Sequence, residues 1–387
     1  MKILLIHTYY TIRGGEDAVF EQEVRLLSKD NEVETLTFLN KGGIRGLILF
    51  LLSIWNIFSA RKLKKKILEF QPDVIHIHNL HFAGSPLLIR TAKKLGIPVV
   101  MTLHNYRLLC PSATLLYNGK IFTESLYVNF PWKVVKNKMY RNSFFQTFWL
   151  AFVTWFHRKI GTWAKVDKFI VLTEFAKQQF INSTFGISEE KFVVKPNFIE
   201  NEVLPKTIER SDEFLFVGRL SVEKGIDVLL QAFSNSEYKL VIAGEGDLLE
   251  RVKIHCKKNK NIRYLGRLNH KEILGQMQKS TTLIFPSVWY EGMPMTIVES
   301  FSTGTPVICS QLGSMSEMIT DEYNGLLFEA GNAEDLKKKL HEWLVKTETE
   351  KEKMRNNAYA EYQEKYTPEI NKQLLENVYL TLCKPND

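Results

Sequence analysis

The sequence has few cysteines, four in 387 residues, and no C-x-x-C spacing. That scatter argues against a disulfide framework or a cysteine zinc site, and favours reduced thiols in a cytoplasmic compartment. Long hydrophobic runs are missing as well. The opening MKILLIHTYY holds only four consecutive apolar residues, too few for a signal-peptide core, and predicts a strand instead. We therefore expect a cytoplasmic protein.

Charge is distributed unevenly along the chain, whose net charge is +8. Residues 1–195 hold 27 Lys and Arg against 14 Asp and Glu, which gives +13. Residues 196–387 hold 24 against 29, which gives −5. A basic first half indicates an anionic partner, either a membrane surface or a nucleic acid. Because the bases form no recognisable nucleic-acid motif, we expect no nucleic-acid partner.

Short apolar runs alternate with amphipathic helical stretches, which predicts an α/β protein with two doubly wound domains. Ten runs have the composition of buried parallel strands: 2–8, 73–79, 98–105, 168–174, 214–219, 239–245, 262–266, 282–287, 306–310 and 325–328. The polar, proline-containing segment 195–213 lacks periodicity and predicts a linker. We expect one domain over 1–195, a second over 196–365, and a last helix within 366–387.

Ligands of open parallel sheets bind beyond the carboxyl ends of the strands, where the second half places several polar residues. Arg219 follows one predicted strand, and Lys224 comes five residues later. An arginine fork and a lysine point charge together suit a diphosphate. The helix expected to begin near Pro294, a residue suited to a first helical position, offers the N–H groups of Met295 and Thr296 to the same anion.

The stretch YEGMPMTIVES (290–300) places one glutamate in a loop and another inside the following helix. A carboxylate can accept two hydrogen bonds from a vicinal diol, so Glu299 suits a ribose. Glu291 is then free for a second sugar. The spacing predicts a nucleotide-sugar site with a phosphate position between the two acids.

Four motifs in order resemble the retaining GT-B-fold glycosyltransferases of family 4: E-G-x-P-x-x-x-x-E, G-R-L-x-x-E-K-G, L-V-I-A-G-x-G and G-x-P-V-I. The resemblance covers essentially the whole chain and is strongest over 214–330. LHNYRLLCP is similar to members that build bacterial surface polysaccharides. The resemblance implies two Rossmann-like domains facing a cleft, with the acceptor on the first, the donor on the second, and the last helix packing back on the first.

The resemblance also implies roles for individual residues. Arg219 and Lys224 neutralise the leaving diphosphate, Glu299 holds ribose and Glu291 contacts the donor sugar. Three residues lie in the nucleobase region: Gly266, Arg267 and Leu268. In the first domain, Gly14 and Gly15 are similar to the family's glycine loop at the diphosphate and acceptor, and His104 to a histidine beside the transferred sugar.

The implied reaction moves a sugar from a nucleotide-diphosphate donor to a glycan acceptor, with retention of the anomeric configuration, in bacterial envelope polysaccharide synthesis. We expect the acceptor to be lipid-linked. No Asp-x-Asp motif stands at a strand end, and two cations can replace Mg²⁺, so we expect no metal or other cofactor. Alternatives of the same architecture are a non-catalytic nucleotide-sugar-binding subunit, an epimerase and a glycan phosphorylase.

Histidines 76, 78 and 81 lack the spacing of a metal site, whereas His78 or Asn79 could line the acceptor side. Segment 44–66 holds an apolar run, Gly46–Phe58, that is too short to span a bilayer, followed by a basic run from Arg61 to Lys66. It predicts either a core helix with a basic end or a helix resting on an anionic membrane surface. The second reading would place the protein on the inner face of the cytoplasmic membrane.

Overall fold

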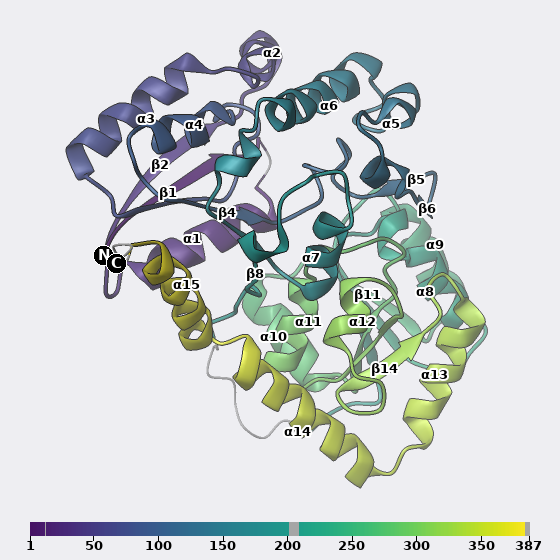
Figure 1. The fold of residues 1–387 in the computed structure, drawn as a ribbon. Coiled ribbons are helices and arrows are strands. Elements are labelled where there is room, and N and C mark those ends of the chain that lie inside the picture. The colour runs from purple at the N-terminus through teal and green to yellow at the C-terminus, as the bar shows by residue number, and fades with distance from the viewer. Residues whose placement is uncertain (12, 201–208, 384–387) are drawn as a thin grey trace. The chain divides into compact units, whose positions relative to one another are not determined.

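The computed structural model describes residues 1–11, 13–200 and 209–383 (Figure 1). The chain divides into two compact units: unit 1 comprises residues 1–115, 122–195 and the described residues from Asn371 on, and unit 2 comprises residues 116–121 and 196–370. Each unit has a six-stranded parallel sheet, so the prediction of two doubly wound α/β domains is confirmed. Of the predicted linker, residues 201–208 lie outside the described residues.

The sheet of unit 1 has the order β2-β1-β3-β4-β7-β8. Its strands are β1 (Lys2–Tyr9), β2 (Glu32–Leu39), β3 (Val74–Ile77), β4 (Val99–Leu103), β7 (Lys168–Val171) and β8 (Phe192–Val194). The inner strands are buried on both faces, which explains their continuous apolar runs. The edge strand β2 alternates between exposed and partly buried residues.

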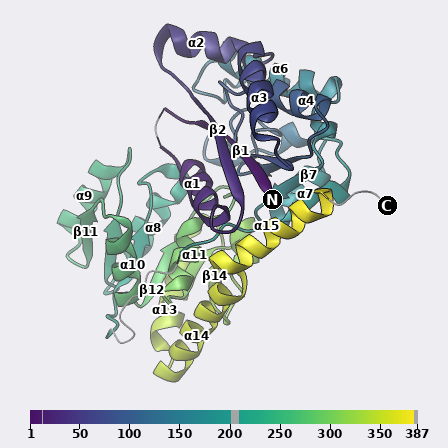
Figure 2. The same cartoon turned by 90° about the vertical axis from the view of Figure 1, so that its left-hand side faces the viewer.

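Helices cover both faces of this sheet (Figure 2). On one face, α1 (Gly15–Leu27) and α15 (Pro368–Cys383) share a core with β1, through side chains such as Phe20, Leu375 and Ile3. On the other face lie α3 (Ile57–Phe70) and α4 (Leu87–Lys94), which pack against each other. The remaining helices of the unit are α2 (Gly43–Leu52), α5 (Trp132–Lys136), α6 (Phe144–Lys159) and α7 (Glu174–Ile181).

The segment 44–66 forms two helices rather than the single helix that its pattern predicts. Helices α2 and α3 are bent by 74° at the break between them. The break has a local cause: the Asn56 side chain accepts hydrogen bonds from the N–H groups of Phe58 and Ser59 and so caps a new helix. No described helix is long and apolar enough to cross a membrane by itself, and this bent pair passes the same test of length and composition only jointly.

Unit 2 has the strand order β11-β10-β9-β12-β13-β14. Its strands are β9 (Phe214–Val217), β10 (Leu240–Ala243), β11 (Ile262–Gly266), β12 (Thr282–Phe285), β13 (Val307–Ser310) and β14 (Gly325–Phe328). Its helices are α8 (Ile226–Phe233), α9 (Leu249–Lys258), α10 (His270–Lys279), α11 (Met295–Ser302), α12 (Ser314–Met318), α13 (Ala333–Val345) and α14 (Glu348–Lys365). The short hairpin of β5 (Leu116–Tyr117) and β6 (Lys120–Ile121) groups with this unit.

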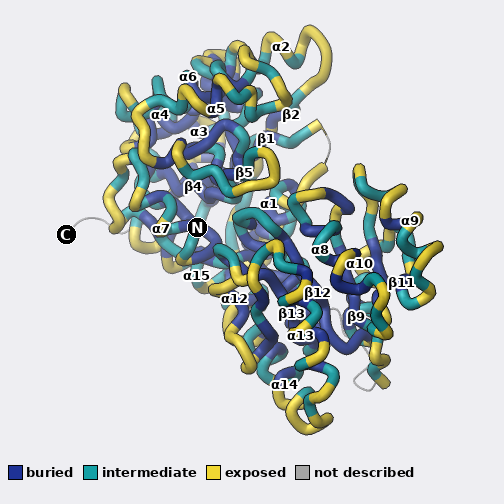
Figure 3. The backbone as a smooth tube through the Cα atoms, turned by 90° about the vertical axis from the view of Figure 1, so that its right-hand side faces the viewer, coloured by how far each residue is buried: buried dark blue, intermediate teal, exposed yellow. Residues whose placement is uncertain are grey.

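The core of unit 2 centres on Phe214, Phe216 and the buried faces of α8 and α13. The inner strands are the most deeply buried elements and are drawn dark blue in Figure 3. Polar side chains therefore reach solvent mainly where the strands end, and that edge of each sheet is where a site can form.

Candidate active site

Two histidines of unit 1 meet just beyond neighbouring strands. His78 follows β3 and His104 follows β4, and these strands pair in parallel, so their carboxyl ends lie at one edge of the sheet. The Nδ1 atom of His78 lies 3.2 Å from the Nε2 atom of His104, and the two rings stack with centroids 5.3 Å apart. One of these nitrogens must donate and the other accept.

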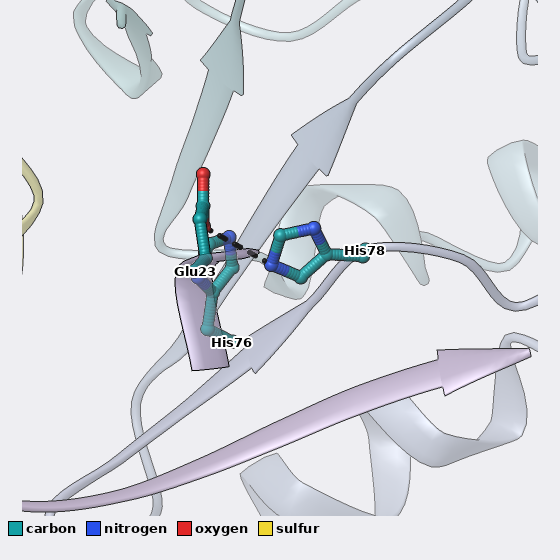
Figure 4. A group of neighbouring side chains, drawn as sticks. All are labelled: Glu23, His76 and His78. Carbon is teal, nitrogen blue, oxygen red and sulfur yellow. Dashed lines mark ion pairs between the residues drawn. The ribbon is translucent and has the colours of Figure 1, made fainter. Parts of the chain in front are cut away.

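Next to the histidine pair is a buried ion pair between Glu23 of α1 and Lys195, which follows β8. Both side chains are fully buried, and the Lys195 ammonium donates to Oε1 of Glu23. The other carboxylate oxygen lies 3.2 Å from Nε2 of His78 and 3.9 Å from Nδ1 of His76 (Figure 4). Glu23 therefore contacts one cation and two imidazoles.

Burial and charge set the protonation states of this cluster. Burial by itself would raise the pKa of Glu23, but Lys195 and the imidazoles outweigh it and hold that pKa well below its ordinary value. Burial lowers the pKa of His76 and the pKa of His104 well below the usual range. Glu23 is thus an ionised acceptor, and His76 and His104 are neutral.

The ionised carboxylate of Glu23 indicates which nitrogen of the histidine pair donates and which accepts. Lys195 already balances the charge of Glu23, and the second carboxylate oxygen of Glu23 faces Nε2 of His78. The carboxylate beside its Nε2 favours the proton on that nitrogen. Nδ1 of His78 then accepts from Nε2–H of His104, which leaves Nδ1 of His104 as an acceptor for a ligand hydroxyl.

Glu23, His76 and His78 also form a group whose ligand atoms all lie within 4.8 Å of one another, a spacing that could hold a metal ion. Both nitrogens of His76 are already in use, however: Nδ1 lies 2.6 Å from the Tyr379 hydroxyl and Nε2 lies 2.7 Å from Oγ1 of Thr102. A metal ion bound by all three residues would have to break one of these hydrogen bonds and lie close to the Lys195 ammonium. The contacts favour a hydrogen-bonded network.

The glycine loop stands at the start of α1, where Gly14 and Gly15 are exposed. Gly14 has φ −119° and ψ 178°, a conformation that any residue adopts, and a Cβ on Gly15 would meet no atom within 4 Å. The fold of the unit alone does not require glycine here. The next residue, Glu16, accepts hydrogen bonds from the Tyr10 hydroxyl and from the side-chain amide of Asn105, which ties the loop to the residue after His104.

In unit 2, a cavity of about 330 Å³ lies at the carboxyl ends of β9, β10 and β11. Arg219, Glu245, Arg267 and Leu268 are among its lining residues. Gly244 also lines it, and its glycine identity has a packing reason, because a Cβ there would lie 1.8 Å from the carbonyl oxygen of Gly218. The structure thus brings Arg219 together with two of the three predicted nucleobase residues.

Lys224 and Glu291, predicted to serve different parts of a ligand, contact each other. Lys224 Nζ donates to Oε1 of Glu291 over 2.6 Å. The same oxygen accepts from the Ser287 hydroxyl at 2.5 Å and from Nε1 of Trp289 at 2.8 Å. Glu291 is only 6% exposed, so these donors satisfy a nearly buried carboxylate. All three bonds use Oε1 and none uses Oε2.

Helix α11 begins one residue later than expected. Pro294 is the N-cap, with extended backbone angles, and Met295 is the first helical residue. A first turn has no preceding carbonyls to bond, so the Met295 and Thr296 N–H groups are available to an anion. Further along the helix, the Oε1 atom of Glu299 lies 3.5 Å from the Nδ1 atom of His270.

Two family models match the chain. The model described as Glycosyltransferase Family 4 matches residues 19–203, and the model described as Glycosyl transferases group 1 matches residues 200–361. Together they span residues 19–361, which contain every strand of the two six-stranded sheets except β1. The chain belongs to the family 4 glycosyltransferases.

This glycosyltransferase is 28% identical to the uncharacterized glycosyltransferase MJ1178 of Methanocaldococcus jannaschii, over 91% of this chain and 90% of that relative. It is 32% identical to the O-antigen biosynthesis glycosyltransferase WbnH of Escherichia coli, over 39% and 42% of the two chains. Its fold resembles that of Anabaena Alr3699/HepE in complex with UDP, with a TM-score of 0.71, 15% identity, and coverage of 98% of this chain and 100% of that chain. The fold is GT-B.

Several residues of the glycosyltransferase escaped prediction. Glu23 and Lys195 were missed because no motif marks them. One signal was present: Glu23 falls three residues after Phe20 and four before Leu27, on the buried face of α1, where a charge needs a partner. Of the predicted residues, Gly266 lies outside the cavity lining, and its carbonyl accepts from the N–H of Gly244. Asn79 has a structural role, because its amide bonds the carbonyl of Thr8.

Proposed function

We propose that this glycosyltransferase moves a sugar from a nucleotide-diphosphate donor to a glycan acceptor during bacterial envelope polysaccharide synthesis. The observation that carries the proposal is the arrangement of unit 2, where a cavity at three strand ends contains Arg219 and Arg267, and Lys224 stands paired with Glu291. Support comes from Alr3699/HepE, whose solved structure is a complex with UDP, and from WbnH, named for O-antigen biosynthesis. In this proposal unit 2 binds the donor and unit 1 the acceptor.

The donor uses unit 2 in three places. The base enters the cavity, and Glu299, which is on α11 and is not among the cavity's lining residues, accepts hydrogen bonds from the ribose hydroxyls. The exposed Arg219 guanidinium, whose contact with Glu223 is a long 3.7 Å, binds the diphosphate together with Lys224 and the N–H groups of Met295 and Thr296. Glu291 offers Oε2 to the donor sugar, since its Oε1 is already occupied.

Unit 1 supplies the histidine relay and the glycine loop. Nδ1 of His104 accepts a hydrogen bond from a hydroxyl group of the transferred sugar, and Glu23 and His78 hold the His104 ring in the tautomer that can do so. At Gly14 and Gly15 the backbone has room for close approach of the diphosphate and acceptor.

In the reaction, the bond between the anomeric carbon and the diphosphate oxygen breaks as the acceptor oxygen bonds the same carbon. The acceptor proton passes to the leaving diphosphate oxygen on the same face, which retains the anomeric configuration. Arg219 and Lys224 stabilise the negative charge that develops on the diphosphate, so no divalent metal ion is required. The acceptor is carried on a lipid at the inner face of the cytoplasmic membrane.

Ligand-induced thermal stabilisation tests the donor site directly. UDP, GDP and ADP, with EDTA present, are compared on the wild type, on Glu299→Ala, and on Glu364→Ala, whose glutamate is exposed on α14 of the same unit. A ligand at a hundred times its dissociation constant stabilises by about 2.7 kcal/mol. We expect one nucleotide to stabilise the wild type and Glu364→Ala but not Glu299→Ala. If no nucleotide or nucleotide sugar shifts the wild type, the proposed donor site is wrong.

Product analysis tests the reaction itself. With the donor found above and a glycan acceptor, nuclear magnetic resonance of the new linkage reports the anomeric configuration. Retention without added metal supports the proposal, and inversion or strict dependence on a divalent ion contradicts that part of it.

A further inference from the structure

Helix α2 presents most of its apolar side chains to solvent. Ile44 is 79% exposed and Leu47 is 52% exposed, and Ile48 and Leu51 are exposed as well. Much of α2 is yellow in Figure 3, in contrast to the dark blue strands. Phe58, in the first turn of α3, is also exposed. A contiguous exposed apolar surface of this kind marks an interaction site rather than a solvated helix face.

Beside α2 lies a groove of about 540 Å³ between β2, α2 and the start of α3. Its apolar lining residues are Phe38, Leu39, Ile48, Leu49, Leu52, Phe58 and Ala83. Lys41, Arg45 and Lys62 line the same groove, and all three are exposed. Among the residues that the structure describes, the lining contains no acidic side chain, and none of these three cations is paired with one. The groove is therefore apolar in its lining and positive in charge.

A second groove, also about 540 Å³, lies on the other side of α3, between that helix and α4. Its lining includes six cations: Arg61, Lys64, Arg90, Lys93, Lys94 and Lys165. One of them, Lys93, is neutralised by Asp167 at 2.8 Å. Both sides of α3 thus attract anions.

We propose that the groove beside α2 binds the phosphate headgroup of an anionic membrane lipid, with the exposed apolar side chains of α2 and Phe58 entering the acyl region. Three unpaired cations complement a phosphate, and the apolar lining complements the chain attached to it. A soluble anion would leave the apolar surface uncovered. Ten helical residues extend about 15 Å, enough to lie in the interface but not to cross a bilayer.

The inference deepens the proposed function and rests on it in one respect: docking on a bilayer brings unit 1 to an acceptor carried on a lipid. Membrane binding itself needs no donor and no catalysis. It can therefore be measured separately from glycosyl transfer, and each can fail without the other.

Flotation with lipid vesicles tests the groove. Vesicles of phosphatidylglycerol and phosphatidylcholine are compared with pure phosphatidylcholine at low salt. The test variant Lys41→Gln/Arg45→Gln/Lys62→Gln is matched by Lys257→Gln/Lys258→Gln/Lys260→Gln, which removes the same charge from exposed lysines of unit 2. We expect the anionic vesicles to bind both the wild type and the control variant. The groove variant should bind these vesicles roughly fivefold more weakly for each lost cation, which is on the order of a hundredfold for all three.

The apolar surface is tested with Leu47→Ser/Ile48→Ser. Its control is Ile254→Ser/Val345→Ser, which removes exposed apolar side chains from unit 2. We expect the α2 variant to lose the part of the binding that survives high salt, because that part comes from apolar insertion, whereas the control keeps it.

The proposal fails if the wild type does not float with anionic vesicles at low salt, if neutral vesicles bind it equally well, or if both triple variants bind alike. If inorganic phosphate stabilises the wild type but not the groove variant, and vesicles do not bind, the groove binds a soluble anion and the proposal is overturned. Melting temperatures establish that each variant is folded. Nucleotide binding by the groove variant shows that unit 2 is intact, so that loss of docking is distinguished from failure of the donor site.

Discussion

Glu23 and Lys195, 172 positions apart in the sequence, form an ion pair in which both side chains are fully buried. The pair joins helix α1 to the residue after an edge strand, next to the histidines at the strand ends. A buried ion pair costs desolvation energy on both sides and is weak evidence for stability. Its value here lies in orienting His78, and through it His104.

Removing only the cation of this pair should be strongly destabilising. In Lys195→Met the carboxylate of Glu23 stays buried without its charge partner, which costs about 3–5 kcal/mol. The double variant Glu23→Gln/Lys195→Met should unfold at higher urea than Lys195→Met alone. Lys65→Met is the control, since its partner Glu69 and Lys65 are both mostly exposed, and such pairs contribute about 0–1 kcal/mol. Equal costs for Lys195→Met and Lys65→Met would refute this reading.

Stability should fall as pH drops from 6.5 towards 4. Burial lowers the pKa of His7 to about 4, although its hydrogen bond to Asp17 opposes the shift, so the unfolded chain takes up this proton at higher pH than the folded one. The contribution of neutral His7 to the free energy of unfolding is thus complete above pH 6.5, and it is lost as the pH falls from 6.5 to about 4. The loss is on the order of 3 kcal/mol. Urea unfolding of the wild type and His7→Gln at pH 7 and pH 5 checks it; an unchanged pH dependence in the variant would contradict it.

The glycine loop should tolerate alanine structurally but not functionally. Gly15→Ala places its Cβ in open space at a helix start, so the free energy of unfolding should change by less than about 1 kcal/mol. Transfer should fall at least tenfold, because the methyl group occupies space that the ligand needs. Gly225→Ala is the opposite case: its φ is +71° and its Cβ would lie 1.8 Å from the Pro286 carbonyl oxygen, so the protein should lose stability. Full transfer activity in Gly15→Ala would remove the loop from the site.

Lys224→Ala should lower kcat by about a hundredfold or more, the effect of removing one group that stabilises developing negative charge. It also leaves the carboxylate of Glu291 without its closest cation. In Lys224→Ala/Glu291→Gln, further loss of activity beyond the single variant should be small, because the two residues act as one unit. The control is Lys253→Ala, whose lysine pairs with exposed Glu250 on α9. Steady-state kinetics with the donor identified by thermal shift gives the comparison.

The central strands were predictable because burial on both faces leaves a continuous apolar run. All ten predicted strands are present, and the run at 262–266 coincides with β11. The edge strands β2 and β8 escaped, since one faces solvent with alternating residues and the other has only three residues. Several predicted strands extended two residues too far, and those extra residues include His78 and His104.

The candidate site was predictable where sequence neighbours form it and not where distant residues do. The motifs pointed to Arg219, Lys224, Glu291 and Glu299 from local spacing. Nothing local could indicate that Lys195 meets Glu23, or that Tyr379 meets His76, because those contacts depend on how strands and helices far apart in sequence pack. The break between α2 and α3 was missed for another reason. Asn56 caps a new helix, but the apolar residues on both sides of it give the pattern of one continuous helix.

Helix α15 gives unit 1 a property that concerns its synthesis on the ribosome. The core of that unit contains Leu375 and Tyr379, and the hydroxyl of Tyr379 bonds His76 beside Glu23. Unit 2, by contrast, is complete at residue 370. During translation, all residues of unit 2 are therefore made before unit 1 is complete. The histidine network of unit 1 includes His76 on β3, whose partner Tyr379 is made some three hundred positions later. A nascent chain interrupted before Tyr379 would carry both glycosyltransferase motif regions and still lack the support of its histidines.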